Sequence, residues 1–234
     1  MTVSETRDDE YVVTIARHGT RSTLRSDVFL TYSQYHEPDG PIGMDYFVWI
    51  IRNAHRTIVV DTGFSRVGAA SRSRDVLIEI PALFALLGVE PADSPSVVIT
   101  HAHYDHIGNL SHFPASRIHL SRHEYEFWTG PNATKTLFHH SVEDDELDYL
   151  RAVVEEGRVD FFEGSRVIAP GVELIELGGH TPVRVWSRSP PRRVSCFSRA
   201  TRFTTTKSSR STCPSSRSPT SWECTRDSNA SGGW

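Results

Sequence analysis

The sequence predicts an α/β fold built from stacked layers of helices and strands. Segments with strand-like and helix-like patterns alternate from residue 11 to Pro182, as layered α/β proteins require. The apolar run SVVIT at 96–100 follows a proline turn and has the length of a buried strand. After Pro182 the alternation ends, and residues 183–234 are rich in serine and arginine. We therefore expect a folded part at 1–182 and a low-complexity tail at 183–234.

The first elements in chain order are predicted to be strands. Residues 11–16 and 27–35 contain the β-branched and aromatic side chains that strands favour, and a Gly/Pro turn follows the second segment. Residues 44–53 and 56–63 repeat this composition on either side of a short polar stretch. They are predicted to form a hairpin that turns around Asn53–His55.

Helices and strands alternate in the rest of the folded part. Residues 75–89 have helical character, broken or restarted at Pro81, with Gly88 near the C-terminal end. The buried strand at 96–100 comes next. The elements predicted after it are helices at 121–128 and 141–157 and strands at 158–164 and 172–179.

Charge and cysteine content divide at the same place as the structural pattern. Residues 1–182 carry 15 basic and 27 acidic side chains, whereas residues 183–234 carry 10 basic and 2 acidic ones and all three cysteines. A metal site in the first part must therefore use histidines and carboxylates. No apolar run reaches the roughly 18 residues of a membrane helix, so we expect a soluble, cytoplasmic protein with no membrane partner.

A cluster of residue types that bind metals follows the predicted strand at 96–100. His101, His103, Asp105 and His106 fall within six positions. Histidines two positions apart in an extended segment point the same way, and the next two residues can then turn toward a second ion. Imidazole and carboxylate groups suit zinc. A lone histidine is usually a solvated residue, but this density of ligands favours a metal site.

The motif HAHYDH resembles the signature of the metallo-β-lactamase fold superfamily. Two further segments match the family, VVDTG at 59–63 and GGHTP at 178–182. The order and spacing of these segments are most similar to the N-acyl-homoserine lactonase branch, over residues 11–182. The resemblance implies a four-layer αββα sandwich, whose second half is incomplete in this chain after Pro182. It also implies a supporting role for Asp61.

The resemblance implies a site for two Zn²⁺ ions. His101, His103 and His180 would hold the first ion, with a fourth position open for water. Asp105, the candidate catalytic residue, and His106 would contribute to the second. A zinc-bound hydroxide would then open a lactone or related ester, which makes the chain a candidate quorum-quenching hydrolase with a small-molecule substrate.

Several alternatives remain open at the level of sequence. A thioesterase of the glyoxalase II kind shares the same histidine and aspartate cluster. The basic tail could instead bind nucleic acid, although the acidic first part disfavours this. Phe127, Trp128 and Phe138 are candidates for an acyl pocket or for ordinary core packing, and Tyr104 is expected to be a packing residue. The oligomeric state is not predicted.

After Pro182 the sequence departs from the family. Residues 183–234 contain no histidine and only two carboxylates, Glu223 and Asp227, so the family's bridging aspartate and last histidine are missing. If each codon's third base is read with the first two bases of the next codon, glycine is permitted across Pro182–Val183 and aspartate across Ala200–Thr201. Both residues fit the family pattern. We therefore predict that the tail is read out of frame and that the second metal site is incomplete.

Overall fold

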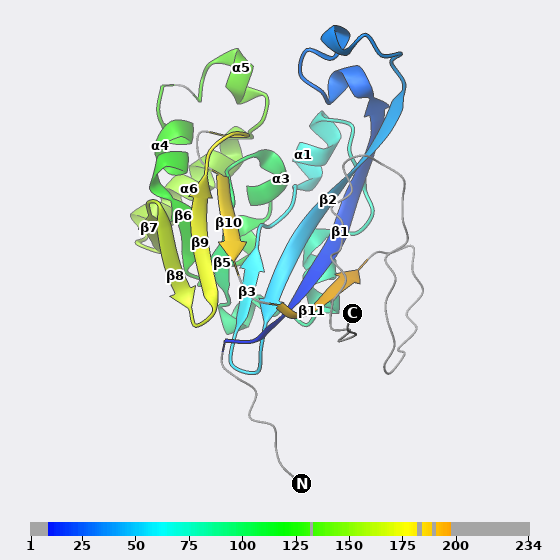
Figure 1. Ribbon diagram of the computed structural model, residues 1–234. Helices are drawn as coiled ribbons and strands as arrows, with labels where there is room; N and C mark the ends of the chain where they lie inside the picture. The colour runs from blue at the N-terminus through cyan, green and yellow to red at the C-terminus, as the bar shows by residue number, and fades with distance from the viewer. Residues whose placement is uncertain (1–8, 132, 182–183, 189–190, 198–234) are drawn as a thin grey trace, which may run out of the picture. The chain divides into compact units, whose positions relative to one another are not determined.

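The computed structural model describes residues 9–131, 133–181, 184–188 and 191–197, with side chains described up to Thr181. These residues lie in one compact unit, Met1–Thr201, and the chain's other unit, Arg202–Trp234, lies outside the described residues. Within the first unit the backbone forms a large mixed sheet and a small antiparallel sheet, with helices around them (Figure 1).

The large sheet has the strand order β11-β1-β2-β3-β5-β6-β7, and β4 pairs with β1. Strands β1 to β3 are antiparallel neighbours, whereas β3, β5, β6 and β7 run parallel to one another. The strands of the large sheet are β1 (Tyr11–Leu24), β2 (Pro41–Arg52), β3 (Thr57–Val60), β4 (Asp75–Val76), β5 (Ser96–Val98), β6 (Ile118–Ser121), β7 (Val159–Phe162) and β11 (Pro191–Phe197). Those of the small sheet are β8 (Ser165–Ala169), β9 (Val172–Leu177) and β10 (Arg184–Arg188).

Helices connect the strands, and short 3-10 turns lie between them. The helices are α1 (Arg66–Ser71), α2 (Ile80–Leu86), α3 (Tyr104–Ile107), α4 (Arg122–Thr129), α5 (Thr136–His139) and α6 (Asp144–Glu155). The 3-10 turns are η1 (Arg25–Asp27), η2 (Tyr32–Tyr35), η3 (Pro91–Asp93) and η4 (Leu110–His112). Among the described helices, none combines the length and the apolar character needed to cross a bilayer.

The large sheet separates two apolar cores, because successive residues of a strand face opposite sides. Val59 of β3 packs with side chains of α2, α4 and α6, whereas its neighbours Ile58 and Val60 pack with Val172 and Leu174 of β9. The described residues therefore form three layers, with helices on one face of the large sheet and the small sheet on the other. The predicted layered α/β fold is confirmed. Of the predicted tail at 183–234, the structure describes 184–188 and 191–197, whose backbone forms β10 and β11, and the rest lies outside the described residues.

The predicted strand at 27–35 is wrong. This segment contains the last residue of η1 and the whole of η2, and β1 instead runs on to Leu24 as one long arm paired with β2. Thr31 and His36 on either side of the second turn have left-handed backbones, each with φ 54°, which a strand cannot accommodate. The aromatic residues that suggested a strand stack locally, with ring centroids of Phe29 and Tyr32 6.0 Å apart.

The predicted helix at 75–89 is correct only in its second half. Asp75 and Val76 form β4, which pairs with the middle of β1, and the helix begins at Ile80 with proline in its first turn. The hairpin, the strand at 96–100 and the two later helices are found close to their expected positions. Strand β8 was not expected from the sequence.

Candidate metal centre

The candidate site lies where strands of both sheets end and their loops begin. Asp61 directly follows β3, the HAHYDH segment follows β5, and His180 follows β9. Because β3 and β5 run parallel, their carboxyl ends lie at the same edge of the sheet. Asp61 and His101, 40 positions apart in the sequence, are thus brought close together because their strands are neighbours in the sheet.

Asp61 occupies a strained turn and links three groups at the base of the site. Its backbone has φ 62°, in the left-handed region, and its side chain is fully buried. The carboxylate accepts hydrogen bonds from the backbone N–H and from the hydroxyl of Thr100, both at 2.8 Å. The same carboxylate lies 2.7 Å from Nδ1 of His106. This supports the expected role of Asp61, because it fixes the ring of His106 and leaves Nε2 directed outward.

Three histidines converge in front of this turn. Ring nitrogens of His101, His103 and His180 lie within 4.8 Å of one another, and the ring centroids are 4.6 to 5.0 Å apart. Nδ1 of His101 lies 3.0 Å from the Thr100 hydroxyl, whose own proton is directed to Asp61. Nδ1 of His101 is therefore the donor in this bond, and its Nε2 is the nitrogen that would bind a metal.

The protonation state of His103 suits a metal ligand. Burial, together with the neighbouring charge of His180, lowers the pKa of His103 to about 3. The ring is therefore neutral at neutral pH, as a ligand must be. Three imidazoles at this spacing match the donor set of a zinc site that keeps a fourth position for water.

Asp105 and His106 lie beside the three histidines as an ion pair. Oδ2 of Asp105 is 3.5 Å from Nε2 of His106, and the ring of His106 is 3.8 Å from that of His101. Burial disfavours the charged form of His106, but the charges of Asp61 and Asp105 outweigh it and raise its pKa to about 10. Burial likewise opposes ionisation of Asp105, yet the charge of His106 lowers its pKa to about 2. Asp61 and Asp105 thus face a single imidazolium, which leaves one net negative charge that would favour a bound cation.

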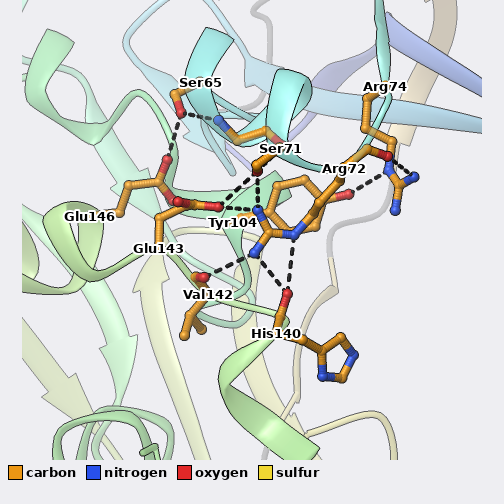
Figure 2. Close-up of polar contacts among 10 residues, drawn as sticks. Ser65, Ser71, Arg72, Arg74, Tyr104, His140, Val142, Glu143 and Glu146 are labelled. Carbon is orange, nitrogen blue, oxygen red and sulfur yellow. Dashed lines mark hydrogen bonds and ion pairs between the residues drawn. The ribbon is translucent and has the colours of Figure 1, made fainter. Parts of the chain in front are cut away.

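Tyr104, between two of the candidate ligands, is held by arginines on the outer side of the turn (Figure 2). The guanidinium of Arg72 lies 4.1 Å from the centre of the Tyr104 ring, and Arg74 donates to the Tyr104 hydroxyl at 2.9 Å. Arg72 also pairs with Glu143 and donates to the carbonyl oxygens of His140 and Val142. Tyr104 is therefore a packing residue in this structure, as the sequence suggested.

Glu124, which sequence reasoning missed, and Trp128, a candidate for an acyl pocket or for core packing, lie against the inner side of the same turn. Glu124 of α4 is fully buried, and its Oε1 accepts a hydrogen bond from the backbone N–H of Ala102 at 2.9 Å. Trp128 donates its indole N–H to the same oxygen at 2.6 Å, and its ring lies 5.3 Å from that of His103. The pattern Ser121-x-x-Glu124 predicts a helix start, and nothing in it indicates the longer-range contact of Glu124 with Ala102.

The remaining candidates lie around the site rather than in it. Phe127 contacts both Trp128 and Phe138, with ring centroids 4.9 and 5.2 Å apart. Phe127 and Phe138 are partly buried against the helix-side core, so they belong at least in part to ordinary packing. His139 pairs with Asp144 on the surface at 3.3 Å. Glu223 and Asp227 lie outside the described residues.

Residues 43–191 match the metallo-beta-lactamase superfamily, and the chain therefore belongs to this superfamily. The large and small sheets packed face to face, with histidines at the strand ends, agree with that assignment.

Among the relatives are proteins that act on acyl-homoserine lactones. The N-acyl homoserine lactonase AiiB of Agrobacterium fabrum is 37% identical over 105 residues, 43% of this chain and 37% of that protein. An N-acyl homoserine lactonase of a Bacillus species is 31% identical over 97 residues, 41% of this chain and 33% of that protein. The matches thus span about a third of the length of these relatives.

Solved structures show the same fold. A quorum-quenching N-acyl homoserine lactone lactonase superimposes with a TM-score of 0.62 at 18% identity, over 78% of this chain and 69% of that one. AidC, a dizinc quorum-quenching lactonase, superimposes with a TM-score of 0.57 at 17% identity, over 74% of this chain and 65% of that one.

Proposed function

We propose that this chain derives from a metal-dependent hydrolase that opens N-acyl homoserine lactones or closely related esters. The observation that carries the proposal is the convergence of His101, His103 and His180 at the strand ends of a metallo-beta-lactamase superfamily chain. The identity to lactonases of two organisms supports the choice of substrate class.

We assign His101, His103 and His180 as ligands of a first Zn²⁺, and Asp105 and His106 as half of a second site. A divalent metal held there would polarise the substrate carbonyl as a Lewis acid and would lower the pKa of water enough to supply hydroxide at neutral pH. Asp105, ionised because its pKa is about 2, is the group placed to accept a proton or to orient a water molecule.

We further propose that the functional domain comprises residues 1–182 and that 183–234 are read out of frame. The tail contributes no histidine, so the second site lacks the partner residues of the family, and we expect activity to be impaired. Sequencing the gene on both strands across codons 175–205 tests this proposal. One missing base near codon 182 supports it, whereas an intact frame contradicts it.

The activity is tested on the full chain and, if a base is missing, on the restored one. Bound zinc is measured by mass spectrometry, and hydrolysis is followed for a panel of acyl-homoserine lactones beside an acylated glutathione. We expect about one tightly bound zinc per full chain, lost in His180→Ala, and a preference for lactones. A preference for the thioester would indicate a glyoxalase II-like enzyme, and salt-dependent retention on DNA would favour the nucleic-acid alternative.

A further inference from the structure

Glu124 is a carboxylate in the interior of the protein beside the candidate metal centre. It lies in the first turn of α4, whose N-cap Ser121 accepts a hydrogen bond from the Glu124 backbone at 3.3 Å. Its fully buried side chain requires specific hydrogen bonds, because an unbonded carboxylate is costly away from water. The helix start alone needs only a short acceptor at the N-cap, so it does not account for a buried glutamate at this position.

A single oxygen of this carboxylate binds two groups that define the histidine cluster. Oε1 accepts from the Ala102 backbone N–H at 2.9 Å, and Ala102 lies directly between His101 and His103. The orientation of this peptide determines the direction in which both side chains leave the backbone. The same oxygen accepts from Nε1 of Trp128 at 2.6 Å.

Trp128 links Glu124 to the ring of His103, one of the proposed metal ligands. Its ring plane meets that of His103 at 74°, with centroids 5.3 Å apart, so the indole limits where the imidazole can rotate. Trp128 is itself buried and can hold this position only with its N–H satisfied. Glu124 thus controls both the backbone of the turn and, through Trp128, one ligand ring.

We propose that Glu124 is a positioning residue for the three-histidine metal centre, acting through Ala102 and Trp128. This inference rests on the proposed function, because it assumes that the cluster binds a metal. Groups that orient metal ligands usually change metal affinity by ten- to a hundredfold when they are replaced. Replacement of Glu124 should therefore loosen the geometry of the site before it unfolds the protein.

The test compares Glu124→Gln and Trp128→Phe with Glu126→Gln, which alters an exposed glutamate of the same helix. Co²⁺ serves as the probe, with affinity measured by chelator competition and coordination by the visible absorption spectrum. Amide hydrogen exchange of the metal-free proteins reports the His101–His103 turn directly. We expect Glu124→Gln to weaken Co²⁺ binding about tenfold or more, to shift the spectrum and to speed exchange at Ala102.

The smaller change, Trp128→Phe, should keep the ring beside His103 and weaken binding by a few-fold, while Glu126→Gln should match the parent protein. Equal Co²⁺ affinity and an unchanged spectrum in Glu124→Gln would overturn the positioning role and leave the proposed function intact. Failure of the parent protein to bind Co²⁺ would overturn both. Hydrogen exchange tests the contact without any metal. An exchange rate at Ala102 that is the same in the parent and in Glu124→Gln would show that Glu124 does not hold the turn.

Discussion

Glu146 should make the stability of this protein fall as the pH rises from about 4.5 to about 7. Burial raises the pKa of this carboxyl to about 7, although the hydrogen bond from Ser65 at 2.9 Å favours the ionised form. Figure 2 shows this bond, and the other oxygen, Oε2, is buried without a hydrogen-bond partner among the described residues. The folded protein therefore prefers Glu146 protonated, and this preference is present in full below pH 4.5 and lost as the pH passes through the folded-state pKa.

The magnitude follows from the interval between the ordinary pKa of 4.5 and the folded value of about 7. At about 1.4 kcal/mol per pH unit, ionised Glu146 costs about 3 kcal/mol of unfolding free energy above pH 7. Glu146→Gln removes the titration, so the difference in stability between variant and parent should shift by about 3 kcal/mol in favour of the variant between pH 4.5 and pH 8.

Urea unfolding at a series of pH values measures this difference directly. Glu155→Gln is the matched control, because Glu155 is exposed on the same helix and should leave the pH dependence of the parent unchanged. If Glu146→Gln and the parent lose stability in parallel as the pH rises, the carboxyl titrates normally in the folded state and the reasoning from burial is refuted.

Two further substitutions test the turn beneath the site. Asp61→Asn should lower the unfolding free energy by about 2–4 kcal/mol, because an amide cannot accept all the bonds that this buried carboxylate makes, including that with His106; a loss under 1 kcal/mol in urea unfolding would contradict this. Gly108→Ala should cost about 3 kcal/mol, since its Cβ would lie 2.4 Å from the backbone nitrogen of Ser65. Gly43→Ala, where the added atom meets nothing within 4 Å, should be nearly neutral by thermal unfolding, and similar losses in both would exclude a steric cause.

The sequence could predict those parts of the site that are local in the chain. The HAHYDH segment carries four candidate ligands within six positions, and the short run before it has the pattern of a buried strand. The geometry agrees with the expectation that His101 and His103 point the same way. His180 is distant in sequence, and only the resemblance to a family connected it with them.

The contacts that sequence reasoning missed all join segments far apart in the chain. Arg72 reaches carbonyl groups about 70 positions away, and Glu124 reaches back 22 positions to Ala102. Neither contact leaves a periodic signal, because each depends on a single long side chain crossing between elements. The wrong strand at 27–35 has the opposite cause, since its aromatic composition satisfies a strand pattern while left-handed residues at both ends of the second turn close it into a compact loop.

The change of sequence character at Pro182 affects the two proposed metal sites differently. His101, His103 and His180 all precede it, as do the core residues among the side chains that the structure describes. Both sheets nevertheless continue past the change, because β10 pairs with β9 and β11 pairs with β1. The second site has only Asp105 and His106 from this part of the chain, and in their present state these two groups balance each other's charge. We therefore expect a first metal to be held by ligands that precede Pro182, whereas a second would have to displace the proton of His106 with no further ligands from the described residues. On the proposed function, we expect one metal per chain as the sequence stands and two when the second half of the sandwich is restored, a count that can be measured without any substrate.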